Sequence, residues 1–184
     1  MILNQDNYLD FDLSGKIIIF PTDTVYGIGC LYKDKESIKR IYNIKNRDYT
    51  KPMVILCANL KQVNEVTKAD QEIPKRILKH WPGALTIILF KNEKVYDIIT
   101  SGRKTVGVRI PGNQISLALL EKYGPMVVTS LNLSNEPAVL KYGETLKFEK
   151  DVDYIVKGSD LHSSPSTVYD LTINKVLRQG EIEI

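Results

Sequence analysis

The sequence predicts one α/β domain built around a mixed β-sheet. Short apolar runs of strand length recur along all 184 residues, and amphipathic helical patterns lie between the earlier runs. The later runs follow one another with few helices between them, which disfavours a purely parallel, doubly wound sheet. No linker or repeat divides residues 1–184, and a chain of this length buries roughly 70% of its unfolded surface as a single domain.

Eight short apolar runs, bounded by Gly, Pro, Asn or Ser, are the expected strands. They cover residues 17–20, 53–57, 85–90, 106–110, 126–129, 154–156, 167–171 and 176–178.

Three helices are expected from a start or stop signal beside an apolar stripe. Asp34 can cap the first helix, Pro74 suits the first turn of the second, and Gly124 can close the third. The stripes are Ile38, Ile41 and Tyr42 in the first helix, Ile77 and Leu78 in the second, and Ile115, Leu119 and Leu120 in the third.

The composition makes several kinds of site improbable. A net charge of +3 is compatible with anionic substrates but does not by itself indicate nucleic-acid binding. Cys30 and Cys57 form no CxxC pair, and His80 and His162 have no ligand spacing, so no disulfide framework, zinc site or His-based triad is expected. The N-terminus lacks the basic region of a signal peptide, and no apolar stretch approaches about 18 residues. We therefore expect a cytoplasmic protein without a membrane segment.

The most informative segment is PTDTVYGIG, residues 21–29, which directly follows the first apolar run. Pro21 fixes its own backbone, and the three residues after it offer short side-chain oxygens that can hold a helix start or a ligand. Gly27 and Gly29 let the backbone approach a neighbour closely. Two interpretations remain open here, a small-molecule site at a strand end and a capped turn leading into a helix.

Two further segments carry cations that suit an anionic ligand. Lys45, Arg47 and Lys51 lie in a predicted loop, where they can bind phosphates or form a solvated basic turn. Arg109 lies inside a run that otherwise predicts a buried strand. Because a buried arginine needs an anion, its partner is a structural carboxylate or a ligand, and we favour a ligand.

Polar side chains also follow the ends of later predicted strands. Ser130 and Asn132 alternate with leucines, so both can face one cleft or cap the local backbone. Ser166 opens another strand. Arg178 closes the last strand before Gly180, either as a solvated strand end or as a ligand contact.

Taken in order, these segments resemble the YrdC-domain family of threonylcarbamoyl-AMP synthases. The matching stretches are PTDTVYGIG (21–29), KNRDYTKP (45–52), WPGALTIIL (81–89), VGVRIP (106–111), TSLNLS (129–134), STVYD (166–170) and RQG (178–180). The length suggests the short form, without the extra C-terminal domain of longer members.

The resemblance implies a twisted mixed sheet around a concave, positively charged cleft. It also implies that L-threonine, bicarbonate and ATP give threonylcarbamoyl-AMP and pyrophosphate, with Mg²⁺ carried on ATP. A downstream transferase complex then modifies adenosine in tRNA, and tRNA itself is a further possible partner. By motif position, the threonine pocket is Thr24, Arg109, Ser130 and Ser166. The ATP site is Lys45, Arg47, Lys51, Thr105, Asn132 and Arg178.

No residue resembles a covalent nucleophile or a resident metal ligand, so the expected catalysis is positioning and charge stabilisation. Two residues depart from the family pattern. Leu56 stands where longer members tend to have histidine, and Leu131 replaces an alanine, where it either narrows the nucleotide pocket or packs. Two other functions remain open, a carbamoyl transferase and a non-catalytic RNA-binding domain.

Overall fold

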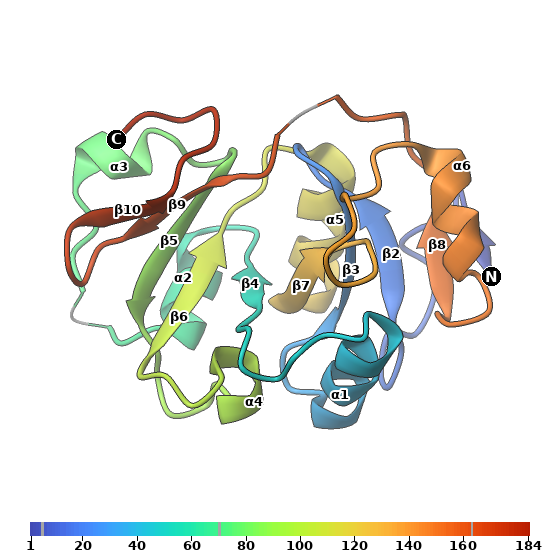
Figure 1. Cartoon of the computed structure of the whole chain (residues 1–184), viewed down its shortest axis with the longest axis horizontal. Coiled ribbons are helices and arrows are strands. Elements are labelled where there is room, and N and C mark those ends of the chain that lie inside the picture. The colour runs from blue at the N-terminus through green and yellow to red at the C-terminus, as the bar shows by residue number, and fades with distance from the viewer. Residues whose placement is uncertain (5, 70, 163) are drawn as a thin grey trace.

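A single mixed β-sheet organises the computed structural model, which describes residues 1–4, 6–69, 71–162 and 164–184. The strands are β1 (Ile2–Leu3), β2 (Ile18–Pro21), β3 (Tyr26–Leu31), β4 (Val54–Leu56), β5 (Leu85–Phe90), β6 (Thr105–Arg109), β7 (Met126–Ser130), β8 (Tyr154–Val156), β9 (Thr167–Asp170) and β10 (Lys175–Arg178). Their order across the sheet is β1-β8-β2-β3-β7-β4-β6-β5-β9-β10. The N-terminus lies near the β8 end and the C-terminus near the β10 end (Figure 1).

Parallel and antiparallel pairs mix along the sheet. The pairs β1–β8, β2–β8, β4–β6 and β5–β9 are parallel, whereas β2–β3, β3–β7, β4–β7, β5–β6 and β9–β10 are antiparallel. The predicted mixed sheet in one domain is therefore confirmed.

Short helices flank the sheet. They are α1 (Lys35–Ile44), α2 (Leu60–Val66), α3 (Lys75–Leu78), α4 (Asp97–Thr100), α5 (Gln114–Tyr123) and α6 (Tyr142–Thr145), followed by the 3₁₀ helix η1 (Leu146–Phe148). The three predicted helices are confirmed as α1, α3 and α5. The Asp34 side chain accepts a hydrogen bond from the Ser37 amide at 3.0 Å, and Gly124 ends α5.

The core forms on both faces of the sheet, which explains why the run at residues 17–20 is apolar throughout. Ile17 and Ile19 pack into the cluster that buries one face of α1. Ile18 and Phe20 point the opposite way, into a second cluster that includes Leu119 and Leu120 of α5.

The PTDTVYGIG segment is a β-hairpin, so a turn leading into a helix is the wrong interpretation. Pro21 pairs with Tyr26 across antiparallel β2 and β3, which leaves residues 22–25 as the turn. A Cβ added to Gly27 would lie 2.8 Å from the Val128 side chain. A Cβ added to Gly29 would lie 2.7 Å from the Val127 carbonyl oxygen. The glycines therefore allow β3 to lie close beside β7.

Candidate functional site

A cavity of about 540 Å³ opens over the middle of the sheet. Eight of the ten predicted site residues line it: Thr24, Arg47, Thr105, Arg109, Ser130, Asn132, Ser166 and Arg178. Lys45 and Lys51 are not among its lining residues. The cavity thus collects residues that are far apart in the sequence.

Strand β6 forms the floor of the cavity. Thr105, Gly107 and Arg109 share one strand face and line the cavity, whereas Val108 is buried in the core. At about 3.3 Å per residue, Thr105 and Arg109 lie roughly 13 Å apart along the strand. The cavity is therefore long enough for a ligand with chemically different ends.

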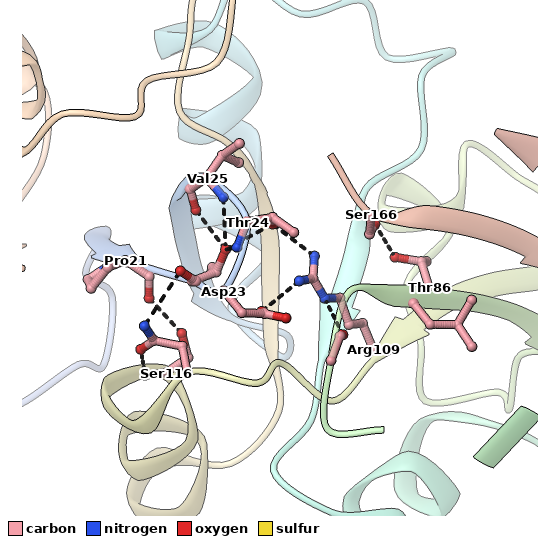
Figure 2. Close-up of polar contacts among 12 residues, drawn as sticks. Pro21, Asp23, Thr24, Val25, Thr86, Arg109, Ser116 and Ser166 are labelled. Carbon is pink, nitrogen blue, oxygen red and sulfur yellow. Dashed lines mark hydrogen bonds and ion pairs between the residues drawn. The ribbon is translucent and has the colours of Figure 1, made fainter. Parts of the chain in front are cut away.

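Arg109 anchors one end of the cavity and is almost completely buried. Its Nη2 contacts the Asp23 carboxylate at 2.6 Å, Nη1 donates to the Thr24 hydroxyl at 3.1 Å, and Nε donates to the Gly83 carbonyl at 3.0 Å (Figure 2). The expected anion is present, but it is the structural carboxylate of Asp23 rather than the ligand that we favoured. A guanidinium has five N–H groups, so these three contacts with described residues leave two for a bound anion.

The β2–β3 turn presents Thr24 to Arg109. The Thr22 hydroxyl accepts from the amides of Thr24 and Val25 at 3.1 and 3.2 Å and donates to the Val25 carbonyl at 2.7 Å. Helix α5 holds the preceding strand, because the Ser116 hydroxyl donates to the Pro21 carbonyl at 2.6 Å (Figure 2). Local turn chemistry, supported by α5, therefore fixes one wall of the cavity.

Ser166 and Arg178 form another part of the wall. The Ser166 and Thr86 hydroxyls lie 2.9 Å apart, and Arg178 donates to the Ser166 carbonyl through Nε at 3.0 Å and Nη2 at 2.8 Å. Arg178 therefore lies at an exposed strand end, but its guanidinium is held against the Ser166 carbonyl. Gly180 packs against the chain itself, since an added Cβ would lie 2.5 Å from the Pro165 carbonyl oxygen.

Lys45 is not the loop cation that the sequence suggested. It is the C-terminal cap of α1, and only 1% of its surface is exposed. Arg47 does lie in the loop, where it donates to the carbonyls of Lys51 and Pro52 at 3.2 and 2.9 Å. Lys51 is exposed. The three cations of this segment therefore have three different environments.

Burial changes the electrostatics of these cations. Burial, with the Arg47 charge as a smaller cause, lowers the pKa of Lys45 to about 7. The oxygens that accept from its Nζ favour the ammonium and act in the opposite sense. Burial also lowers the pKa of Arg47, and it lowers that of Arg178 together with the charge of Arg109. An anion in the cavity would relieve the repulsion between Arg178 and Arg109.

The sequence interpretation missed several lining residues, including Thr86, Thr100, Arg103 and Glu136. Thr86 lies in a predicted strand, but nothing in the sequence indicated that its hydroxyl contacts the Ser166 hydroxyl. Arg103 follows α4, a four-residue helix that was not expected. Leu56 pairs with Arg109 across β4 and β6 and lines the cavity. Leu131 is completely buried in the core, so it packs rather than narrowing the cavity.

The described part of the chain also bears on metal binding and on membrane insertion. Within it, no group of three or more His, Cys, Asp or Glu side chains could hold a metal ion. None of the helices there has the length and apolar character needed to cross a membrane.

The chain is similar in sequence to several known proteins. Threonylcarbamoyl-AMP synthase of Pyrococcus abyssi is 36% identical over 166 residues, which are 88% of this chain and 49% of that protein. The synthase of Bacillus subtilis is 36% identical over 68% of this chain and 37% of its own length. The uncharacterized protein YciO of Escherichia coli is 34% identical over 90% of this chain and 84% of its own. The chain thus spans about half or less of the two synthases.

A solved structure and a family model agree with these relatives. The structure of P. abyssi Sua5 in complex with L-threonine superposes with a TM-score of 0.89 at 33% identity, covering 98% of this chain and 57% of the other. The Sua5/YciO/YrdC model, described as telomere recombination, matches residues 12–180. The predicted resemblance is therefore confirmed, and the chain belongs to the Sua5/YciO/YrdC family.

Proposed function

We propose that this protein is a threonylcarbamoyl-AMP synthase, a nucleotidyltransferase in tRNA modification. The amine of L-threonine combines with bicarbonate to form a carbamate and water. A carbamate oxygen then attacks the α-phosphorus of ATP, and the bond to the β-phosphate breaks to release pyrophosphate. The product would pass to a downstream transferase complex that acts on tRNA.

The single observation that carries this proposal is the shared cavity. It combines a buried arginine that has further N–H groups, several hydroxyls, and the additional arginines Arg47, Arg103 and Arg178. A carboxylate with neighbouring polar groups suits the first set, and a polyphosphate suits the second. The similarity to a Sua5 structure that contains L-threonine supports the same assignment.

We assign the threonine pocket to Thr24, Arg109, Ser130 and Ser166, all of which line the cavity. The two remaining N–H groups of Arg109 would bind the carboxylate, and the hydroxyls would hold the amino and hydroxyl groups. Leu56, opposite Arg109 on the neighbouring strand, offers an apolar surface for the threonine methyl group.

We assign the ATP site to Arg47, Thr105, Asn132 and Arg178, which line the cavity, with Lys51 approaching the phosphates from the exposed loop. The arginines would stabilise the charge that develops as pyrophosphate leaves. No protein nucleophile is needed, because the carbamate is the nucleophile. Mg²⁺ would arrive with ATP as part of the substrate.

Pyrophosphate release tests the proposal. The purified protein is incubated with ATP and Mg²⁺, with threonine and bicarbonate each present or omitted. We expect release only when both are present. Release that is indifferent to threonine would overturn the assignment. AMP formation that needs carbamoyl phosphate instead would indicate a carbamoyl transferase, and salt-dependent RNA binding without turnover would indicate an RNA-binding domain.

A further inference from the structure

Lys45 clamps the segment that leaves β7. Its Nζ donates to the carbonyl oxygens of Ser130 and Asn132 and to Oδ1 of Asn132, the last two at 2.7 Å. Its own carbonyl accepts from the Ser134 amide at 2.9 Å. An ammonium has three N–H groups and a neutral amine has two, so these three acceptors use all of them in either form. Lys45 therefore has no donor left for a phosphate.

Asn132 has a fully occupied side-chain amide. Oδ1 accepts from Lys45 Nζ and from the Ser130 hydroxyl, the latter at 2.8 Å. Nδ2 donates to the carbonyl oxygens of Leu133 and Glu136 at 3.0 and 2.7 Å. A carboxamide has two donors and two acceptor lone pairs, so the chain itself fills them all. Asn132 thus organises its own loop, although it lies at the cavity wall.

The arrangement sets the direction of the Ser130 hydroxyl. The Ser130 hydroxyl donates its proton to Asn132 Oδ1, because a carboxamide oxygen can only accept a hydrogen bond. The hydroxyl oxygen therefore turns its lone pairs toward the cavity that Ser130 lines. It can accept a hydrogen bond there, from a group such as the amine or the hydroxyl of threonine.

We propose that Lys45 is a positioning residue, which acts through Asn132 to hold the Ser130 hydroxyl as a hydrogen-bond acceptor for threonine and does not itself bind ATP. This inference rests on the proposed function and changes the roles of Lys45 and Asn132 within it. The direct contact with substrate is made by Ser130, and the buried lysine supplies the geometry of that contact.

A double-mutant cycle on threonine affinity tests the inference. The dissociation constants of threonine and of ATP are measured separately by titration calorimetry for the wild type, Lys45→Met, Ser130→Ala and the double variant. We expect Lys45→Met and Ser130→Ala each to weaken threonine binding about 10-fold or more, because a hydrogen bond in the pocket is lost. The double variant should be no weaker than Ser130→Ala alone, and ATP affinity should stay within about twofold.

Lys39→Met is the matched control, since it makes the same substitution in α1 at a half-exposed lysine whose polar partner among the described residues is Glu36. It should leave both affinities unchanged. Lys45→Gln keeps two N–H donors and should recover part of the threonine affinity. It also replaces Lys45→Met in the cycle if circular dichroism finds that variant unfolded.

Three outcomes would overturn the inference: weaker ATP binding with threonine unchanged, additive effects of the two substitutions, or equal loss for both ligands. Absence of threonine binding in the wild type is a different result. It would contradict the proposed function itself, before any variant is compared.

Discussion

Arg109 illustrates what a single side chain contributes at the candidate site. Its charge is balanced inside the protein by Asp23, and its contacts with the described residues leave two N–H groups for a ligand. A second carboxylate would therefore join a partly neutralised pair. The binding free energy then depends on how well the pocket orders both anions around one guanidinium.

Arg109→Ala should weaken threonine binding more than ATP binding. Truncating one partner of a buried charged pair costs about 2–5 kcal/mol, which is roughly 30-fold to a few thousand-fold in affinity. Arg109→Lys should restore only part, because the planar fork is lost. Titration calorimetry measures the threonine and ATP affinities of both variants. Unchanged threonine affinity in Arg109→Ala would show that the threonine pocket has been assigned to the wrong residues.

The same substitution leaves the Asp23 carboxylate without its guanidinium, so a fall in stability of about 3–5 kcal/mol is expected as well. Urea unfolding measures this effect. Binding experiments must therefore be made at a temperature at which the variant remains folded.

The stability contributed by Lys45 should depend on pH. Its pKa falls from 10.5 to about 7 on folding, so between these values the unfolded chain binds more protons than the folded protein. Stability relative to Lys45→Met should then rise with pH across that window, by at most on the order of 1 kcal/mol per pH unit. Urea unfolding of both proteins at several pH values from 6 to 10 checks the sign.

Below about pH 7 the lysine is protonated in both states, so the stability difference should be constant there. A difference that stays flat or falls above pH 7 would mean that the accepting oxygens outweigh desolvation and hold the amine charged.

Among the elements, those with clear periodic or capping signals were predictable. Strand β5 and helix α1 follow from an apolar run and from a capped stripe. Strand β3 was missed because Gly27 and Gly29 interrupt its pattern, and their purpose is visible only once β7 lies beside them. Helix α4 has four residues and carries too little periodicity to detect.

Gly29→Ala tests this reading of β3. The new Cβ would lie 2.7 Å from a backbone oxygen and 2.8 Å from the Val128 side chain, so the sheet must shift. We expect a loss of about 1–3 kcal/mol in stability, measured by urea unfolding. Gly143→Ala is the control, because its Cβ would meet nothing within 4 Å in helix α6 and should be neutral or slightly stabilising. Equal effects of the two substitutions would contradict the close approach of β3 and β7.

At the scale of the whole molecule, the sheet brings the hairpin turn, the 45–52 loop and β10 to one cavity. The sequence motifs named most of the residues that meet there, because most of them lie within or directly beside a recognisable strand. The contacts between them were not predictable. Nothing local in the sequence pairs Asp23 with Arg109 or Thr86 with Ser166, since those contacts arise from strand order.

Arg178 shows how this assembly alters an expectation. From the sequence alone, Arg178→Ala is expected to weaken the use of ATP and to leave threonine binding little changed. Because Arg178 donates to the Ser166 carbonyl, we now expect the ATP KM to rise severalfold and the threonine KM to rise with it. Steady-state pyrophosphate release measures both values. Unaltered ATP kinetics would leave the 45–52 loop as the main phosphate binder.

The most direct test of the proposed reaction follows the bicarbonate carbon. The protein is incubated with ATP, threonine and ¹³C-bicarbonate, and the adenylate product is analysed by mass spectrometry. We predict an adenylate with the mass of threonylcarbamoyl-AMP that carries one ¹³C and is absent when threonine is omitted. Pyrophosphate release without a labelled adenylate, or no adenylate at all, would contradict the proposal.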